Sequence, residues 1–155
     1  MYNFIIDKLR ARLASWKANT LSFTSCLNFI YSITTALPTH IMQCTLLHTK
    51  VCKEIDKLHR NFLWGDTAST KKMHLKNWNI VTLPKAIRGL SIKRSLPLNK
   101  ALLAKRAWTL QSTTSDPWAI TLKRKYLSHL PPTKKLSSTW HSLTKVNHIC
   151  DRGIG

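Results

Sequence analysis

The stretch VCKEIDKLHRNFLWG, residues 51–65, has the clearest helical pattern in the chain and decides its fold class. Four apolar side chains recur at the spacing of one helix face: Val51, Ile55, Leu58 and Phe62. Four cations fall on the far side of the same helix: Lys50, Lys53, Lys57 and Arg60. Thr49 suits the N-cap position and Gly65 suits the end of the helix. We therefore predict one helix with a core face and a cationic face.

The sequence on either side of this stretch predicts further helices. Before it, the apolar spacing indicates a helix over residues 5–16, a second from Leu21 that ends before Pro38, and a short third over 41–47. After it, Pro97 suits the first turn of a buried helix, and Asp116 followed by Pro117 is a strong helix start. A last helix is predicted from residue 140 to about 149.

The segment around residues 73–93 has a different pattern. Met73 and Leu75 alternate with Lys and His, and Leu90 and Ile92 flank Ser91 in the same way. Alternation of this kind favours short strands. We therefore predict a mainly α fold, a helical bundle with a small β-hairpin-like insertion around residues 73–93.

Charge is the strongest global feature of this 155-residue chain, which has room for one domain, or one small domain with a loose tail. It carries 25 Lys and Arg against 6 Asp and Glu, for a formal net charge of +19. Nucleic acid is the commonest partner of such a surface, because lysines that neutralise phosphates release condensed counterions. The alternatives are a surface whose charge only solvates the protein and a surface that docks on anionic lipid.

The four cysteines show no short paired spacing, which favours free thiols in a reducing compartment. No apolar run reaches the length of a membrane span, so we predict none. The first helix is basic and also resembles a mitochondrial transit peptide. Nucleus and mitochondrion therefore both stay open as locations.

The carboxylates give no sign of a catalytic centre. Phosphodiester chemistry needs acids that converge on metal ions, and the six acids here are scattered. We expect Glu54 and Asp56 to be salt-bridging surface groups among the cations of their helix. No glycine-rich phosphate loop is present either. The sequence thus predicts no enzyme, no cofactor and no small-molecule substrate.

Two weak patterns could suggest zinc. Cys44, His48 and Cys52 recur every four residues, but a helix break near His48 would separate them. His141, His148 and Cys150 are better interpreted as loop and helix-face residues. We therefore predict no metal site.

Six stretches together resemble the region that follows the polymerase core in plant LINE-type (non-LTR) retrotransposon polyproteins, which are often named as ribonuclease H or reverse transcriptase proteins. They are LRARLASWKANTLSF (9–23), LPTHIMQ (37–43), the stretch over 51–65, HLKNWNIVTLP (74–84), LNKALLAKRAW (98–108) and WAITLKRKYL (118–127). The chain departs from the family at several positions. Relatives often read Gly-Arg where this chain has Ser25 and Cys26, and a usual Lys is Tyr31 here. Where relatives read Gly-Gly-Leu-Gly, this chain has Arg88-Gly89-Leu90-Ser91, which puts the hairpin geometry in doubt.

The resemblance implies that residues 1–130 are the helical thumb and connection of a reverse transcriptase, and that residues 131–155 are a linker and a truncated C-terminal helix. The polymerase and ribonuclease H centres of that family would lie outside this chain, so we expect a catalytically inactive fragment. A thumb grips its template-primer duplex through phosphates. The cations that we expect to contact nucleic acid are Lys50, Lys53, Lys57, Arg60, Lys71, Lys72, Lys123, Arg124 and Lys125.

Two alternatives of other classes stay open. One is a basic structural or interaction protein, such as an organellar ribosome-associated protein whose Trp residues pack on partner helices. The other is an orphan reading frame with no selected function. The oligomeric state is not indicated by any pattern in the sequence.

Overall fold

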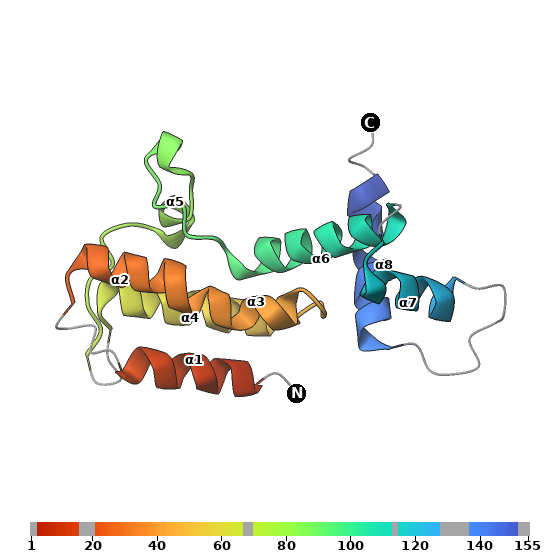
Figure 1. The fold of residues 1–155 in the computed structure, drawn as a ribbon. Helices are drawn as coiled ribbons and strands as arrows, with labels where there is room; N and C mark the ends of the chain where they lie inside the picture. The colour runs from red at the N-terminus through yellow and green to blue at the C-terminus, as the bar shows by residue number, and fades with distance from the viewer. Residues whose placement is uncertain (1–2, 16–20, 67–69, 113–114, 128–136, 152–155) are drawn as a thin grey trace. The chain divides into compact units, whose positions relative to one another are not determined.

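The structure, a computed structural model, describes residues 3–15, 21–66, 70–112, 115–127 and 137–151, with the side chains of all of these except 33, 34 and 148–151. These residues form helices joined by turns and loops, with no strand among them, so the predicted mainly α fold is confirmed. In chain order the elements are α1 Asn3–Ser15, α2 Phe23–Phe29, the π-helix η2 Ile30–Thr34, α3 Ala36–Met42, α4 Thr49–Trp64, α5 Trp78–Val81, the 3-10 turn η3 Lys85–Ile87, α6 Ser95–Gln111, α7 Pro117–Tyr126 and α8 Ser138–Asp151 (Figure 1).

The chain divides into two compact units. The first comprises Met1–His40 and Leu47–Leu98, and the second comprises Ile41–Leu46 and Asn99–Gly155. One boundary falls inside α3, one falls between Leu46 and Leu47 before α4, and one falls inside α6. Each unit therefore consists of two separate stretches of sequence. The assignment of residues 1–130 to a thumb and connection concerns function and stays a prediction.

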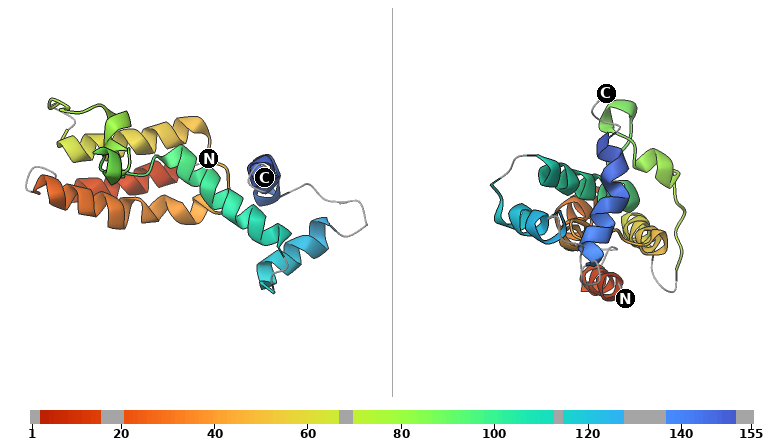
Figure 2. Two further views of the ribbon diagram at one scale, coloured as in Figure 1. Left: turned by 90° about the horizontal axis from the view of Figure 1, so that it is seen from above. Right: turned by 90° about the vertical axis from the view of Figure 1, so that its right-hand side faces the viewer.

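Helix α4 is the centre of the first unit. Helices α1 and α2 both pack against it, and they lie alongside it in both views of Figure 2. Its buried face carries Cys52, Ile55, His59, Phe62 and Leu63. Across the contact with α2, the ring centroids of Phe29 and Phe62 lie 5.3 Å apart. The core face is therefore real, but it is rotated from the predicted one, since Val51 and Leu58 are only half-buried.

The two ends of α4 follow local rules. Gly65 ends the helix in the left-handed region at φ 70°, as predicted. The N-cap is His48 rather than the predicted Thr49, because the His48 Nδ1 accepts the backbone N–H of Lys50 at 3.2 Å. His48 has extended backbone angles, so the helix breaks at the position where the sequence suggested a break.

The segment before α4 differs from the prediction at Pro38. The predicted helix was to end before this proline, whereas α3 begins at Ala36 and contains it. Pro38 is the third residue of α3 and so lies in its first turn, the part of a helix that tolerates proline best. Upstream, η2 is a π-helix, in which each hydrogen bond spans five residues instead of four, as where the Thr35 N–H donates to the Ile30 carbonyl.

The β-hairpin predicted around residues 73–93 is wrong. The segment instead forms α5, capped by the Asn77 side chain, and the short turn η3. Met73 and Leu75, whose alternation suggested a strand, are 82% and 72% exposed, so no core rewards an extended pairing. Near its end the segment folds back on α5, where the Leu90 N–H donates to the Val81 carbonyl at 2.9 Å. The Tyr31 hydroxyl donates to the Leu90 carbonyl and ties this return to η2.

The turn over residues 88–91 explains the family's glycines. Arg88 and Ser91 both adopt left-handed backbone angles, at φ 62° and 57°. These are the two positions where the resemblance expects glycine and this chain has a side chain. Between them, a Cβ on Gly89 would lie 1.9 Å from the Leu83 carbonyl oxygen, so the remaining glycine is sterically required.

The second unit has its own core between α6, α7 and α8. Its buried members are Leu103, Ala107, Leu110, Ala119, Leu143 and Val146. A fully buried polar side chain, Asn99, stands one turn before Leu103 on α6. Its amide donates to the carbonyls of Met42 at 2.8 Å and Thr45 at 3.0 Å, which satisfies the end of α3. No helix in the described part of the chain combines the length and apolar character needed to cross a membrane.

Candidate nucleic-acid interface

The cationic face of α4 lies opposite its core face, as the sequence predicted. Lys50, Lys53 and Lys57 are exposed and fall within one narrow sector of the helix. From Lys50 to Lys57 the row spans about 10 Å along the axis. The Lys57 amine lies 3.8 Å from Glu54, which confirms the predicted surface pairing of that acid. Such an exposed pair is weak, so it does not remove Lys57 from the cationic row.

Arg60 is the exception in this row. It is half-buried, and its Nε is enclosed with no hydrogen-bond partner in the described part of the chain. An enclosed guanidinium nitrogen cannot reach a phosphate as readily as an exposed lysine amine. The three lysines are therefore the better candidates on α4.

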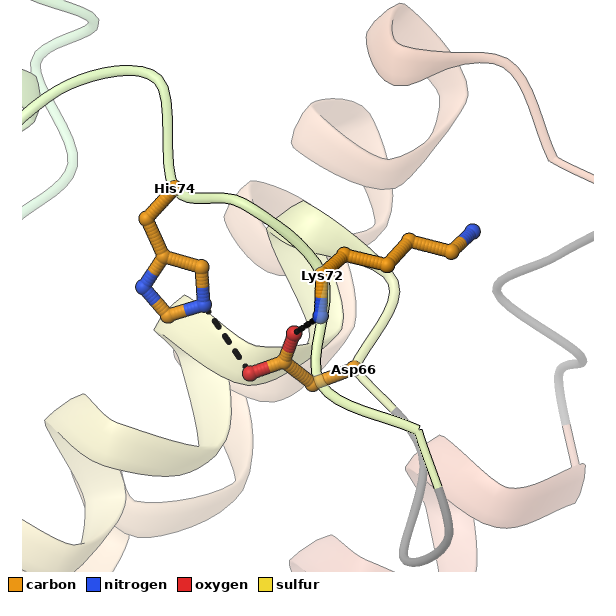
Figure 3. Close-up of polar contacts among 3 residues, drawn as sticks. All are labelled: Asp66, Lys72 and His74. Atoms are coloured by element: carbon orange, nitrogen blue, oxygen red, sulfur yellow. Dashed lines mark hydrogen bonds and ion pairs between the residues drawn. The ribbon is translucent and has the colours of Figure 1, made fainter.

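A second group of predicted cations lies in the loop that follows α4. Asp66 organises this loop, because its Oδ1 accepts the backbone N–H of Lys72 and its Oδ2 bonds the His74 Nε2, both at 2.9 Å (Figure 3). The His74 ring stacks on the Trp64 ring, with the two ring centroids 5.9 Å apart. Figure 3 shows the Lys72 side chain extending away from the Asp66 carboxylate. Lys71 and Lys72 are both exposed.

The charge of Asp66 is well supported in this setting. Burial raises the pKa of its carboxyl, but the Lys72 backbone hydrogen bond, the His74 contact and the nearby Lys71 charge outweigh burial and leave the pKa lowered. The carboxylate therefore stays ionised at neutral pH and holds the loop that presents the two lysines.

The third predicted group belongs to the last turn of α7, in the second unit. Arg124 and Lys125 are exposed, and the Lys125 amine lies 5.2 Å from the Tyr126 ring centroid. Lys123 is half-buried, and its amine donates to the Ser112 carbonyl at 2.9 Å. It closes the end of α6, so we assign it a structural role rather than a phosphate contact.

Asp56 is not the surface salt-bridging group that the sequence suggested. Its Oδ1 accepts both the backbone N–H and the hydroxyl of Ser95, at 2.9 Å and 2.7 Å. Ser95 is 3% exposed and is the first residue of α6. The carboxylate therefore caps α6 from α4, a long-range contact that local spacing cannot reveal.

Arg106 is a further charged residue that the sequence reasoning missed. Its Cζ lies 5.1 Å from the Trp118 ring centroid, and its Nη2 lies 3.2 Å from the Gln43 Oε1. Position 106 lies in a mostly apolar stretch of α6. A cation at such a position was the feature of the sequence that could have indicated a partly buried charged residue.

The candidate zinc ligands Cys44, His48 and Cys52 do not form a metal-binding group. Cys44 is exposed before the His48 cap, while Cys52 is buried inside α4, where burial and the nearby Asp56 charge raise its pKa to about 11. The side chains of His148 and Cys150 lie outside the described residues. Among the side chains that are described, no three His, Cys, Asp or Glu are grouped as metal ligands would be.

Comparison with known proteins gives one curated relative of note, a protein of Arabidopsis thaliana named "Putative ribonuclease H protein". It is 32% identical over 159 residues, which cover 97% of this chain and 26% of the relative. This chain thus spans 26% of the length of the curated relative. No protein-family profile matches the chain, and no solved structure matches it. The similarity supports the ribonuclease H-like part of the resemblance, without singling out a LINE-type thumb.

The comparison also corrects the prediction that this chain is not an enzyme. The relative carries the name of an enzyme family, and the similarity to it covers nearly the whole chain, so the finding points toward an enzyme. The prediction rested on scattered acids in 155 residues. Because this chain corresponds to 26% of the relative, the placement of its own acids does not decide the activity of the protein.

Proposed function

We propose that this chain is a nucleic-acid-binding part of a non-LTR retrotransposon protein of the reverse transcriptase and ribonuclease H type, in its thumb and connection region. It holds RNA or DNA without sequence preference, through phosphate contacts. The row of exposed Lys50, Lys53 and Lys57 opposite the α4 core carries this proposal. The core face of α4 packs in the first unit and fixes the lysine row in place. The opposite, lysine-bearing face can therefore bind a polyanion.

The charge balance supports the same reading. If every Asp and Glu neutralised one cation, a formal charge of +19 would still remain. The excess positive charges on a compact protein repel one another. Binding to phosphates relieves this repulsion and releases the counterions condensed on the nucleic acid. Lysine amines act as point charges on flexible stems, which suits non-specific phosphate contacts better than base recognition.

The test is filter binding of the full chain to one duplex and one single strand at 50 and 200 mM salt. Three duplex phosphate contacts give a slope of about −2.7 in log affinity against log salt, so affinity should fall by roughly 40-fold between the two conditions. Two duplexes of unrelated sequence should bind alike. Affinity that ignores salt, or that differs strongly between the two sequences, would contradict the proposal.

A further inference from the structure

A pocket in the second unit is lined by apolar and aromatic side chains, unlike the lysine row on α4. Its volume is about 490 Å³, and its lining residues are Gln43, Cys44, Arg106, Trp118, Thr121, Leu122, Thr139 and Leu143. No acid is among the described residues that line it. Its size and mainly apolar walls are those of a ligand site with a few polar groups.

Arg106 is the one charged group among the described residues of the wall. It contacts the Gln43 side-chain carbonyl oxygen and the Trp118 ring, and both groups are formally neutral. A guanidinium has five N–H donors in a planar fork, and Gln43 accepts from one of them. The pocket therefore combines an aromatic plane, apolar walls and a positive charge that no acid among its described lining residues neutralises.

The chemistry complementary to these walls is a flat aromatic group that carries an anion. Unpaired bases are recognised by stacking on aromatic rings and guanidinium planes, with cations on the adjoining phosphate. Lys125 stands one helical turn beyond Thr121 on the same side of α7, and it is exposed. A strand whose base enters the pocket would carry its phosphates toward cations of this kind.

We infer that this pocket receives an unpaired nucleotide of a single-stranded nucleic acid. The inference rests on the proposed function and adds a second, strand-selective site to it. The α4 row contacts only phosphates and does not distinguish paired from unpaired strands. The pocket does distinguish them, because a base inside a duplex is stacked and cannot enter.

Two variants of the full chain test the pocket. Arg106→Gln removes the charge, and Thr121→Phe places a ring into the cavity from an exposed position on α7. The matched control is Ile120→Phe, which adds the same ring at the preceding position of α7, since Ile120 is exposed and is not among the lining residues. Binding of an eight-nucleotide single strand and of a duplex is measured for each. We expect roughly tenfold weaker single-strand binding for both pocket variants, with duplex binding and the control unchanged.

Cys44 supplies a readout that does not depend on the variants. It is exposed and lines the pocket, so the bound single strand should slow its alkylation several-fold, as followed by peptide mass spectrometry. Protection by a free mononucleotide at equal concentration, as strong as by the strand, would overturn the commitment to a strand.

The outcomes separate the two proposals. Unchanged single-strand binding in both pocket variants, or unprotected Cys44 in the complex, overturns the pocket while salt-dependent duplex binding leaves the proposed function standing. If the wild-type chain binds neither strand, both proposals are wrong.

Discussion

Replacing Asp56 with alanine should destabilise the first unit. The effect should be far larger than expected for a surface carboxylate among the cations of α4. The change removes two hydrogen bonds to Ser95, at 2.9 Å and 2.7 Å, and leaves the Ser95 N–H and hydroxyl enclosed in a residue that is 3% exposed. Hydrogen bonds to a charged group contribute about 1.5–3 kcal/mol each, with losses that overlap when they share one acceptor. We therefore expect about 3 kcal/mol for Asp56→Ala and about half of that for Asp56→Asn, which keeps a neutral acceptor.

Glu54→Ala is the matched control, because it removes the same charge two residues away on the same helix. Glu54 makes only the exposed 3.8 Å pair with Lys57, so its loss should cost no more than about 0.5 kcal/mol. Urea unfolding followed by circular dichroism measures both, and hydrogen exchange at the Ser95 amide should accelerate in Asp56→Ala alone. If the two alanine variants differ by less than about 0.5 kcal/mol, the capping of α6 by Asp56 is refuted.

Three further predictions follow from single residues. Asn99→Ala should cost about 2–4 kcal/mol in urea unfolding, because it strands the Met42 and Thr45 carbonyls and opens a cavity; a loss below 1 kcal/mol would contradict this. Arg88→Gly should stabilise the protein by about 1 kcal/mol, measured in the same way, since a left-handed backbone at φ 62° penalises a side chain; destabilisation would show that the turn is not strained. Cys52, with its pKa raised to about 11, should resist alkylation at pH 8 under native conditions and react in urea, and modification in the native state as fast as in urea would disprove its burial.

Much of the helical fold could be predicted because its signals are local. The α4 pattern, the Gly65 stop and the Asp116–Pro117 start each depend on a few neighbouring residues, and the structure has all three. The rotation of the α4 core face could not be predicted from spacing, because it depends on where α1 and α2 pack. His59 is buried for that reason, although its residue type suggested the surface.

The wrong predictions share a physical cause. Each depends on whether residues distant in the sequence come into contact, which local spacing does not show. The alternation at Met73 and Leu75 predicted a strand, yet no partner surface covers these side chains among the described residues. Asp56 was assigned to the surface because its partner Ser95 lies 39 residues away. Asn99 did leave a signal, as a polar residue in the apolar row that continues through Leu103. A polar residue buried in such a row needs hydrogen-bond partners, which here are the Met42 and Thr45 carbonyls.

The candidate interface was predicted as a charge pattern, and its members now separate by environment. Lys50, Lys53 and Lys57 are exposed on one face, whereas Arg60 is half-buried and Lys123 bonds a backbone carbonyl. Residue type alone cannot distinguish an exposed amine from one that closes a helix end. The pocket beside Arg106 was equally hidden, since its walls come from separate helices of the second unit.

The role of the α4 lysines is tested most directly by comparing the salt dependence of duplex binding in two triple variants of equal net charge. Lys50→Gln, Lys53→Gln and Lys57→Gln together remove the α4 row. The control changes Lys93, Lys100 and Lys105 to Gln, which are also exposed but do not form one row, because Lys100 and Lys105 lie about 140° apart around α6.

Binding is titrated from 50 to 200 mM salt for the wild type and for both variants. We expect the α4 variant to flatten the slope of log affinity against log salt by about 2.7, and the control to flatten it by less than about 1. Equal slopes in the two variants would contradict the claim that the α4 face holds the phosphates.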